Sequence, residues 1–414
     1  MSEWKEVKLG EIARSNQSTY SPKDNWKFAN YLDTGNITEN RISKILFIDL
    51  MKEDLPSRAR RKVRKNSIIY STVRPNQKHF GIIKNIPENF LVSTGFSVLD
   101  VDESKANPDF VYYSLTQEKN TVTLHAVAEQ STSAYPAIKP SDIENLPIKL
   151  PPLAEQKRIA EILGSLDDKI ELNNAINKNL EEQAQALFKN WFVDFAPFGG
   201  VMPGEWHTYK LSELADFISG YAYKGSELVE SNIGMATIKN FERNGGFKLD
   251  GFKDVQPSDK IKENQFVDVF DILVAHTDLT QNAEVIGNAE VILSKCEYDK
   301  LTMSMDLVKV VAKDDISPFL LAALLRTERF KKHCLGYVNG TTVLHMSKKA
   351  LPEYEISLPK NLSSLNHFAK MSESIIKQMA NSIEENQRLV KLRDTLLPKL
   401  MSGEQTAKRE TEEP

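Results

Sequence analysis

The chain contains two copies of one pattern, separated by about half of its 414 residues. The segment Trp4–Ala13 (WKEVKLGEIA) recurs 202 positions later as Trp206–Ala215 (WHTYKLSELA). Two further matches pair Asn66–Thr72 with Asp271–Thr277, and Pro147–Pro151 with Tyr354–Pro359. The first of these reads in both copies as a buried strand that ends in small polar residues. A repeat of this length predicts two related mixed α/β domains within one chain.

Each copy is followed by a long helical pattern with apolar residues in steps of three and four. The first stripe runs through Leu163, Leu166, Ile170, Asn173, Asn177, Leu180, Ala184, Leu187 and Trp191. The second runs through Ile375, Met379, Ser382, Asn386, Leu389, Leu396 and Leu400, with Arg393 as an interruption. A 3.5-residue period is typical of a coiled-coil seam, and helices of about forty residues span roughly 60 Å, too long to bury that seam within a small domain. The predicted fold class is α+β, with two pseudo-symmetric mixed α/β domains joined by two long antiparallel coiled-coil helices.

Proline and glycine indicate the boundaries between these parts. Pro151, Pro152 and Pro359 precede the helical patterns, and Phe198–Gly204 is rich in Gly and Pro. We therefore expect a first domain at 1–150, a central helix at 151–195, a linker at 196–205, a second domain at 206–359 and a C-terminal helix at 360–403. The tail 404–414 is charged and lacks large apolar residues, which predicts disorder.

Composition excludes several classes of protein. The 53 basic and 57 acidic residues give a net charge of −4, which argues against a globally basic nucleic-acid coat but allows a local basic face. Two cysteines, Cys296 and Cys334, cannot form a disulfide scaffold or a Cys-rich zinc site, and the seven His show no metal-ligand spacing. Neither a signal peptide nor an apolar run of about 20 residues is present, so we expect a cytoplasmic protein without a membrane span.

Four motifs give the chain a family resemblance. Leu150–Ile159 (LPPLAEQKRI) resembles the LPPLxEQxxI start of the central helix in type I restriction–modification specificity subunits. Asn190–Phe195 (NWFVDF) and Leu396–Gly403 (LLPKLMSG) are also similar to that family, and Phe217–Lys224 (FISGYAYK) is similar to its GxxFK element, with Tyr223 in place of Phe. The resemblance covers essentially the whole chain.

This resemblance implies a function and a set of partners. Each mixed domain would be a target-recognition domain that reads one half of an asymmetric, two-part site in double-stranded DNA, while the helices act as a spacer. Two modification (methyltransferase) subunits would dock on the chain and methylate adenine with S-adenosylmethionine, and restriction subunits that use ATP and Mg²⁺ would join them. The chain itself would be a non-catalytic specificity subunit that binds no cofactor and no metal.

Candidate DNA contacts in the first domain fall into two groups. A dense basic run, suited to neutralising phosphates, comprises Arg58, Arg60, Arg61, Lys62, Arg64 and Lys65, followed by Arg74 and Lys78. Polar side chains suited to base edges are Asn76 and Gln77, which follow a predicted strand, and Gln130, Ser131, Thr132 and Tyr135 in a second predicted loop. The alternative interpretation is that these are solvated loops.

The second domain has no basic run of comparable density. Its candidates for base contacts are His276, Thr277, Gln281 and Asn282, and then Asn339, Thr341, Thr342 and His345. Tyr221, Tyr223 and Lys224 are candidates for the DNA backbone. This domain is expected to use neutral donors, or to depend on phosphate contacts made by the modification subunits.

Asn177 and Asn386 occupy equivalent seam positions in the two helices. A buried seam Asn costs stability unless it meets a polar partner, and it then fixes the register. We therefore hypothesise that these two side chains lie close together across the helix pair; the alternative is that both face solvent.

Fragments of enzyme motifs leave catalytic alternatives open. Asn107–Phe110 (NPDF) resembles the NPPF element of adenine methyltransferases, but Asp109 replaces the second proline. Gly220 and Gly225 have the spacing of a phosphate loop but lack the following Lys. The alternatives are a self-contained DNA methyltransferase or nuclease, and a helical assembly protein that does not touch DNA.

Overall fold

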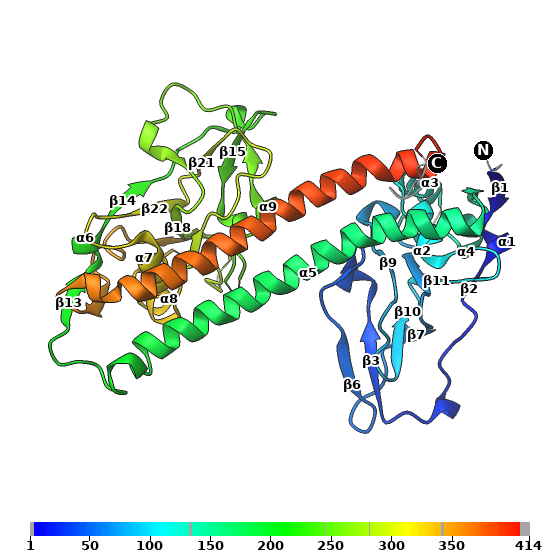
Figure 1. Cartoon of the computed structure of the whole chain (residues 1–414), viewed down its shortest axis with the longest axis horizontal. Coiled ribbons are helices and arrows are strands. Elements are labelled where there is room, and N and C mark those ends of the chain that lie inside the picture. The colour runs from blue at the N-terminus through cyan, green and yellow to red at the C-terminus, as the bar shows by residue number, and fades with distance from the viewer. Residues whose placement is uncertain (1–3, 132–134, 244, 281, 341–342, 406–414) are drawn as a thin grey trace, which may run out of the picture. The chain divides into compact units, whose positions relative to one another are not determined.

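The computed structural model describes residues 4–131, 135–243, 245–280, 282–340 and 343–405, which form two compact units. The first unit comprises the chain up to Asp168 and the chain from Leu389 onward, and the second comprises Lys169–Arg388. Each unit contains one of the predicted domains and parts of both long helices, which are coloured green and orange-red in Figure 1.

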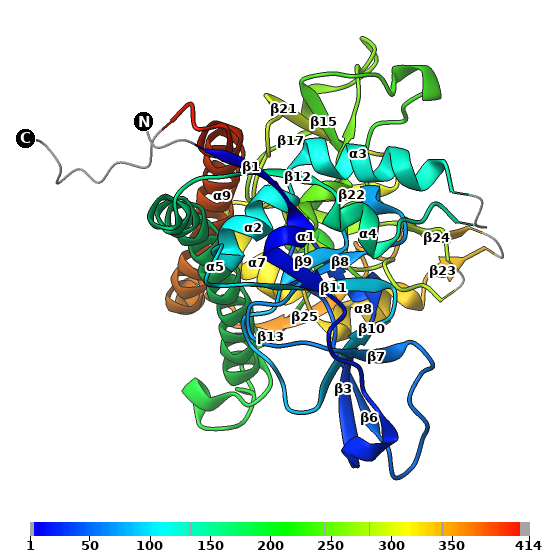
Figure 2. The ribbon, with the colours of Figure 1, turned by 90° about the vertical axis from the view of Figure 1, so that its right-hand side faces the viewer.

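Two four-stranded sheets form most of the first domain. One sheet has the order β2 (Ala13–Ser15), β11 (Phe96–Val101), β8 (Ile68–Ser71), β9 (Phe80–Ile82), and the other β6 (Leu46–Asp49), β3 (Phe28–Leu32), β10 (Phe90–Ser93), β7 (Ala59–Lys62). Two short pairs join β1 (Lys5–Lys8) to β12 (Pro147–Leu150) and β4 (Ile37–Thr38) to β5 (Arg41–Ile42). The helices are α1 (Leu9–Ile12), α2 (Pro108–Leu115), α3 (Glu118–Glu129) and α4 (Pro140–Glu144). Figure 2 shows β3 and β6 side by side as an antiparallel pair.

The second domain uses the same plan. Its sheets have the orders β14 (Ala215–Ser219), β22 (Leu307–Ala312), β18 (Ile272–Ala275), β20 (Ala289–Val291) and β16 (Lys253–Asp254), β15 (Ile233–Ala236), β21 (Lys300–Met303), β17 (Phe266–Val267). β13 (His207–Lys210) pairs with β25 (Glu355–Leu358), and a small sheet has the order β19 (Thr277–Asp278), β24 (Leu344–Met346), β23 (Val338–Asn339). The helices are α6 (Leu211–Leu214), α7 (Pro318–Leu325) and α8 (Glu328–Leu335).

The strand pairings confirm the predicted duplication. The order β2-β11-β8-β9 matches β14-β22-β18-β20, and β6-β3-β10-β7 matches β16-β15-β21-β17. In the second type of sheet the pairs β3/β10 and β15/β21 are both parallel, whereas the flanking pairs are antiparallel. Because order and direction agree strand by strand, the two domains are copies of one fold.

Burial explains why the central strands read as continuous apolar runs. All four residues of β8 are buried, since helices cover one face of its sheet and the second sheet covers the other. Ile68 and Tyr70 pack with Phe110 of α2, while Ile69 packs with Val92 of β10.

The first long helix, α5 (Leu153–Phe192), begins directly after Pro151 and Pro152. Gln156, the glutamine of the LPPLxEQ motif, is 1% exposed. Its side chain donates to the Pro151 carbonyl and accepts from the Asn107 N–H, both at 2.8 Å. The motif therefore fixes the start of α5 against the cap of α2.

The second long helix, α9 (Asn366–Ser402), begins later than expected. A 3-10 turn (Leu362–Leu365), capped by the Asn361 side chain, precedes it. The helix ends at Gly403, which has a left-handed φ of 80°.

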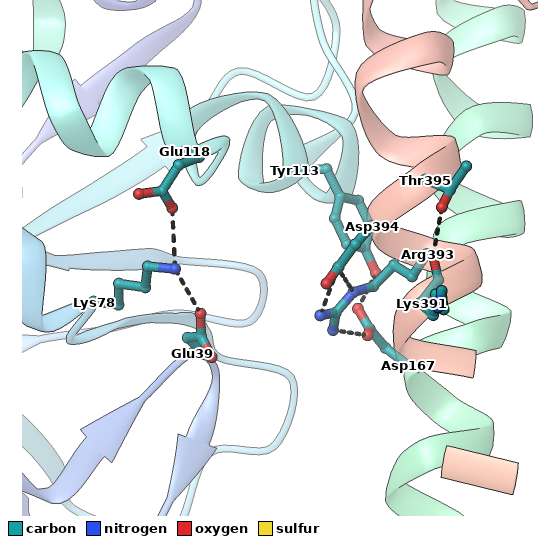
Figure 3. A network of polar contacts seen from close by, with 9 residues as sticks. All are labelled: Glu39, Lys78, Tyr113, Glu118, Asp167, Lys391, Arg393, Asp394 and Thr395. Atoms are coloured by element: carbon teal, nitrogen blue, oxygen red, sulfur yellow. Dashed lines mark hydrogen bonds and ion pairs between the residues drawn. The ribbon is translucent and has the colours of Figure 1, made fainter. Parts of the chain in front are cut away.

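The two helices pair antiparallel within each unit, as predicted. In the first unit, Ile159 and Leu163 share one core with Leu400 and Met401. In the second unit, Asn173 contacts Asn386 whereas Asn177, further along α5, contacts Met379, earlier in α9. Arg393, which interrupts the apolar stripe, forms an ion pair with Asp167. Arg393 Nη1 lies 2.8 Å from Asp167 Oδ1, and the Tyr113 hydroxyl donates to Asp167 Oδ2 at 2.7 Å (Figure 3).

Candidate nucleic-acid interface

In the first domain, the structure brings the two predicted reading loops together. Val73 and Ala137 form an antiparallel bridge. The Arg74 N–H donates to the Pro136 carbonyl at 2.9 Å, and the Ile138 N–H donates to the Thr72 carbonyl at 2.8 Å. The Ser131 hydroxyl accepts from the Ala137 N–H. These bonds join segments that lie about sixty residues apart in the sequence into one site.

Arg74 has the most restricted geometry at this site. Its backbone is left-handed (φ 48°), and Pro75 follows it at the start of the 3-10 turn η3 (Pro75–Gln77). Its guanidinium carbon lies 5.2 Å from the ring centre of Tyr135, which is 60% exposed. A guanidinium held by an aromatic face keeps its N–H edge available for the bidentate contact that arginine makes with guanine. Asn76 and Gln77 are exposed on the same turn.

Lys78 has acidic partners that its local sequence does not reveal. Its Nζ lies 3.2 Å from Glu39 Oε1 and 3.0 Å from Glu118 Oε2 (Figure 3). The Glu118 carboxylate, followed by Glu39, raises the pKa of Lys78 even though burial opposes this. Two carboxylates already balance this charge, so Lys78 stabilises the base of the site and offers little attraction to a phosphate.

The basic run divides into paired and unpaired cations. Lys62 is paired with Asp24 at 2.6 Å and lies 5.3 Å from the Trp26 ring centre. Arg64 is paired with Asp100 at 3.1 Å and donates to the Val101 carbonyl. Within the stretch 58–65, all of which the structure describes, Arg58, Arg60, Arg61 and Lys65 form no ion pair. These four are the better candidates for phosphate contacts.

Hydrogen bonds connect the basic run to the reading loops. The Thr94 N–H donates to the Arg58 carbonyl, and the Thr72 N–H donates to the carbonyl of the neighbouring Gly95, both at 2.8 Å. Arg61 is half-buried, burial lowers its pKa, and its Nε has no hydrogen-bond partner among the described residues. Because this Nε is enclosed within the protein, it is not itself exposed to DNA.

The second domain brings its predicted loops together in the same way. Thr277 pairs with His345 across β19 and β24, and their Oγ1 and Nδ1 atoms are 3.3 Å apart. The Met346 N–H donates to the His276 carbonyl, and exposed Asn339 lies opposite His345 in β23. Figure 2 shows β23 and β24 as neighbours. Thr277 is only 3% exposed, so it positions His345 and does not itself offer a DNA contact.

His276 is half-buried at this second site. Burial lowers its pKa, and the charges of His345 and Lys348 act in the same direction, while Asp306 opposes them. A neutral imidazole has one donor and one acceptor, which suits hydrogen bonding to a base edge more than phosphate neutralisation.

Asp278 was not among the predicted residues, yet it shapes the second loop. It is 3% exposed, and its two carboxylate oxygens accept from the N–H groups of Thr280, Val285 and Ile286. Although burial works against ionisation, these donors hold the pKa of Asp278 below its ordinary value. The Asp-x-Thr sequence is typical of such a turn and is the signal that identifies it.

Tyr221 requires a correction. It is 4% exposed, and its hydroxyl donates to Glu227 at 2.7 Å and lies 3.0 Å from Ser258 Oγ. A buried, hydrogen-bonded phenol supports the loop that follows it and does not reach the DNA backbone. Tyr223 is half-buried and Lys224 is exposed, and their contact with the DNA backbone remains a prediction.

Several other predicted residues fall into two groups. Gln130 and Asn282 are exposed next to their loops. Thr132, Gln281, Thr341 and Thr342 lie outside the described residues.

The seam asparagines are paired one turn away from the predicted register. Asn386 bonds to Asn173 and Asn174, each at 2.9 Å, rather than to Asn177. Asn177 donates instead to the Met379 carbonyl at 3.3 Å. The seam is polar at this level, but the predicted partner is wrong by one helical turn.

Two further observations concern the described residues. Within the part of the chain that the structure describes, no group of three or more His, Cys, Asp and Glu side chains could hold a metal ion. None of the described helices has the length and apolar character that crossing a bilayer requires. Cys296 and Cys334 are both free thiols.

Comparisons with known proteins point to one family. Residues 1–182 match the family model "Type I restriction modification DNA specificity domain". The chain is 28% identical to the type I restriction enzyme HindI specificity subunit of Haemophilus influenzae, over 98% of this chain and 100% of that one. It is 24% identical to the MjaIX specificity subunit of Methanocaldococcus jannaschii, over 93% and 85%.

One solved structure has the same fold. The type I restriction–modification S subunit from M. genitalium is similar with a TM-score of 0.60 over 96% of both chains, at 16% identity. The duplicated domains, the two long helices and the motifs agree with this likeness, and the chain is similar over essentially its whole length to type I restriction–modification specificity subunits.

Proposed function

We propose that this chain is the DNA sequence-recognition subunit of a type I restriction–modification complex. The observation that carries the proposal is one fold built twice, with a two-loop site at the same place in each copy. Val73 and Ala137 bridge the first site as Thr277 and His345 bridge the second. Two readers with equal frames and different side chains suit a DNA site with two different halves.

The side chains at the two sites differ in chemistry. Arg74 follows Val73 in the first copy, whereas Asp278 follows Thr277 in the second and is used up in capping its own loop. The first site offers an arginine with exposed amides, and the second offers imidazoles with Asn282 and Asn339. Arginine prefers guanine and amides prefer adenine, so the two half-sites should differ in sequence.

In this proposal, α5 and α9 are the spacer between the half-sites and the seat for partner subunits. On α5, Leu172 is 54% exposed and Ile176 is 38% exposed, which leaves apolar surface for another helix to cover. The partners would be two modification subunits, which use S-adenosylmethionine, and restriction subunits, which use ATP and Mg²⁺, in the cytoplasm. The chain would contribute no catalytic group and no cofactor site of its own.

Methylome sequencing of cells with and without this chain, in the presence of its modification subunits, tests the proposal. We expect methylated adenine in a two-part motif with a fixed gap, present only when the chain is present. Unchanged methylation would contradict a role in recognition. Methyl transfer or cleavage by the purified chain alone, with labelled S-adenosylmethionine or Mg²⁺ and DNA, would instead establish the enzyme alternative.

A further inference from the structure

The two domains have opposite charge balances. Residues 1–150 contain 21 Lys and Arg against 18 Asp and Glu, whereas residues 206–359 contain 18 against 22. The chain's small net charge therefore hides a positive first domain and a negative second domain. Since phosphate binding depends on local positive charge, the difference bears directly on how each domain meets DNA.

Shared backbone bonds show which positions correspond in the two copies. The Asn66 N–H donates to the Ile83 carbonyl as the Phe270 N–H donates to the Ile292 carbonyl, and both residues are left-handed, at φ 66° and 77°. One residue further, the Ser67 N–H donates to the Arg64 carbonyl, and the Asp271 N–H donates in the same way to the Asp268 carbonyl. These bonds match Asn66 with Phe270, one residue earlier than the sequence comparison, which paired Asn66 with Asp271. Extending the same offset of 204 back through the basic run gives the counterpart of each of its residues.

At these matched positions the second domain has lost nearly all of the basic run. Only Arg58 keeps a basic counterpart, Lys262. Uncharged side chains replace three unpaired cations: Asn264, Gln265 and Val269 stand where the first domain has Arg60, Arg61 and Lys65. An acid, Asp268, replaces Arg64 and is paired with Lys295 at 2.9 Å.

The reading loops show the same difference. Arg74 is exposed in the first loop, and its matched residue in the second is Asp278, whose carboxylate is buried against its own backbone. Burial, then His345 and then Lys348 lower the pKa of His276, so Lys348 is a cation close to the second loop. Lys348 and Lys349 are exposed and, like the backbone candidate Lys224, form no ion pair among the described residues, so they compete with the first domain's cations for phosphates.

We propose that the first domain supplies most of the charge that neutralises DNA phosphates, and that the second domain reads DNA mainly through uncharged donors. This proposal rests on the proposed function. The salt dependence of DNA binding then belongs to the first half-site, and the first domain provides the sequence-independent attraction that brings the chain onto a duplex.

The test compares two variants that remove the same number of charges. The full chain is titrated with a random-sequence 40-base-pair duplex at several KCl concentrations, and log Kd is plotted against log[KCl]. The first variant, R58A/R60A/K65A, removes three unpaired cations of the first domain. The matched control, K262A/K348A/K349A, removes three exposed cations of the second domain.

We expect the first variant to reduce the slope by about 2 to 3, because each phosphate contact contributes about 0.9, and the control to reduce it by less than about 1. The charge-keeping variant R58K/R60K/K65R should retain the wild-type slope. Equal reductions in the first variant and the control would overturn the proposal while leaving DNA recognition intact. Failure of the wild-type chain to bind any duplex would instead contradict the proposed function itself.

A gain-of-charge variant covers the case in which R58A/R60A/K65A does not fold. Asn264 is exposed and matches Arg60, so N264R should increase the slope by about 0.9. An unchanged slope in folded N264R, as judged by its thermal unfolding, would show that this position does not face phosphates and would also overturn the proposal.

Discussion

Asn173 Nδ2 donates to Asn386 Oδ1 across the two long helices of the second unit, at 2.9 Å, and to Glu385 Oε2 at 2.8 Å. Asn173 is only 1% exposed, whereas the Glu385 side chain is 47% exposed, so the seam buries the donor while water reaches one of its two acceptors. The Asn173 hydrogen bond, followed by Lys169 at 3.2 Å, holds the pKa of the Glu385 carboxyl below its ordinary value. The contact fixes the register of the helix pair at this level.

The first prediction concerns this contact. Asn173→Ala should lower the free energy of unfolding by about 1 kcal/mol, because it removes the buried donor of Asn386 from the seam. Urea denaturation followed by circular dichroism measures the change. Asn179→Ala, at an exposed position of the same helix, is the control and should have little effect. Equal effects of the two variants would contradict a register role for Asn173.

The second prediction concerns the interruption of the apolar stripe at Arg393. Arg393→Ala removes the cation that faces Asp167, and the Tyr113 hydroxyl remains as a donor to that carboxylate. We expect a loss of about 1 to 2 kcal/mol, since both charges are partly exposed and solvent screens them. Arg388→Ala breaks an exposed pair with Glu384 on the same helix and should cost almost nothing in the same denaturation experiment.

The third prediction is a pH dependence. The Lys224 N–H, and after it the Tyr221 hydroxyl, hold the pKa of Glu227 at about 2, below its ordinary value of 4.5. A carboxyl whose pKa is lowered by folding stabilises the fold fully above pH 4.5, and this contribution is lost as pH falls toward 2. Unfolding measured at pH 5 and pH 3 should therefore show a fall in stability, and this fall should be smaller in Glu227→Gln. An identical pH dependence in both proteins would rule out this role for Glu227.

The fourth prediction concerns base reading by Arg74. Arg74→Ala should change the preferred base at one position of the first half-site by about 1 to 3 kcal/mol of discrimination and leave the second half-site unchanged. Arg74→Lys should not restore the preference, because lysine lacks the planar fork. Sequencing of methylated sites measures both effects. Lys65→Ala is the comparison: it should weaken all sites alike, and a changed motif in that variant would contradict the division into readers and phosphate contacts.

The fifth prediction concerns the helical spacer. Inserting seven residues into each helix, between residues 168 and 169 and between 388 and 389, adds about 10 Å, or roughly 3 base pairs of DNA. The gap in the methylated motif should lengthen by that amount. An insertion in only one helix should disturb the pairing and abolish recognition, and an unchanged gap in the double insertion would refute the spacer.

The duplication and the antiparallel helices follow from the sequence because each leaves a local pattern. A buried strand reads as a run of apolar residues, as in Ile68–Ser71, and a helix seam repeats every 3.5 residues. The segment that follows each central strand is polar, and this pattern is why residues in 74–78 and 276–282 are candidate DNA contacts, which remains a prediction.

Other features depend on residues that are distant in the sequence. Lys78 reads as part of a basic run, but Glu39 and Glu118 meet it only once the fold is formed. The same reason applies to Tyr221. Its segment is aromatic and contains glycine, which suggests an accessible loop, but its hydroxyl contacts Glu227 and Ser258 in the folded chain. The partner of Asn386 depends on how the two helices pack together. The heptad pattern of each helix fixes which face is buried, but it leaves the axial offset between the helices uncertain by one helical turn.

Phe270 has the same left-handed backbone as Asn66, its match in the first copy. A bulky aromatic residue at φ 77° is costly, and asparagine, which tolerates that conformation better, occupies the matching position 66. The second copy has thus kept a backbone shape that its own side chain does not favour. The two copies therefore share one main-chain conformation at this position although their side chains differ in how well they tolerate it.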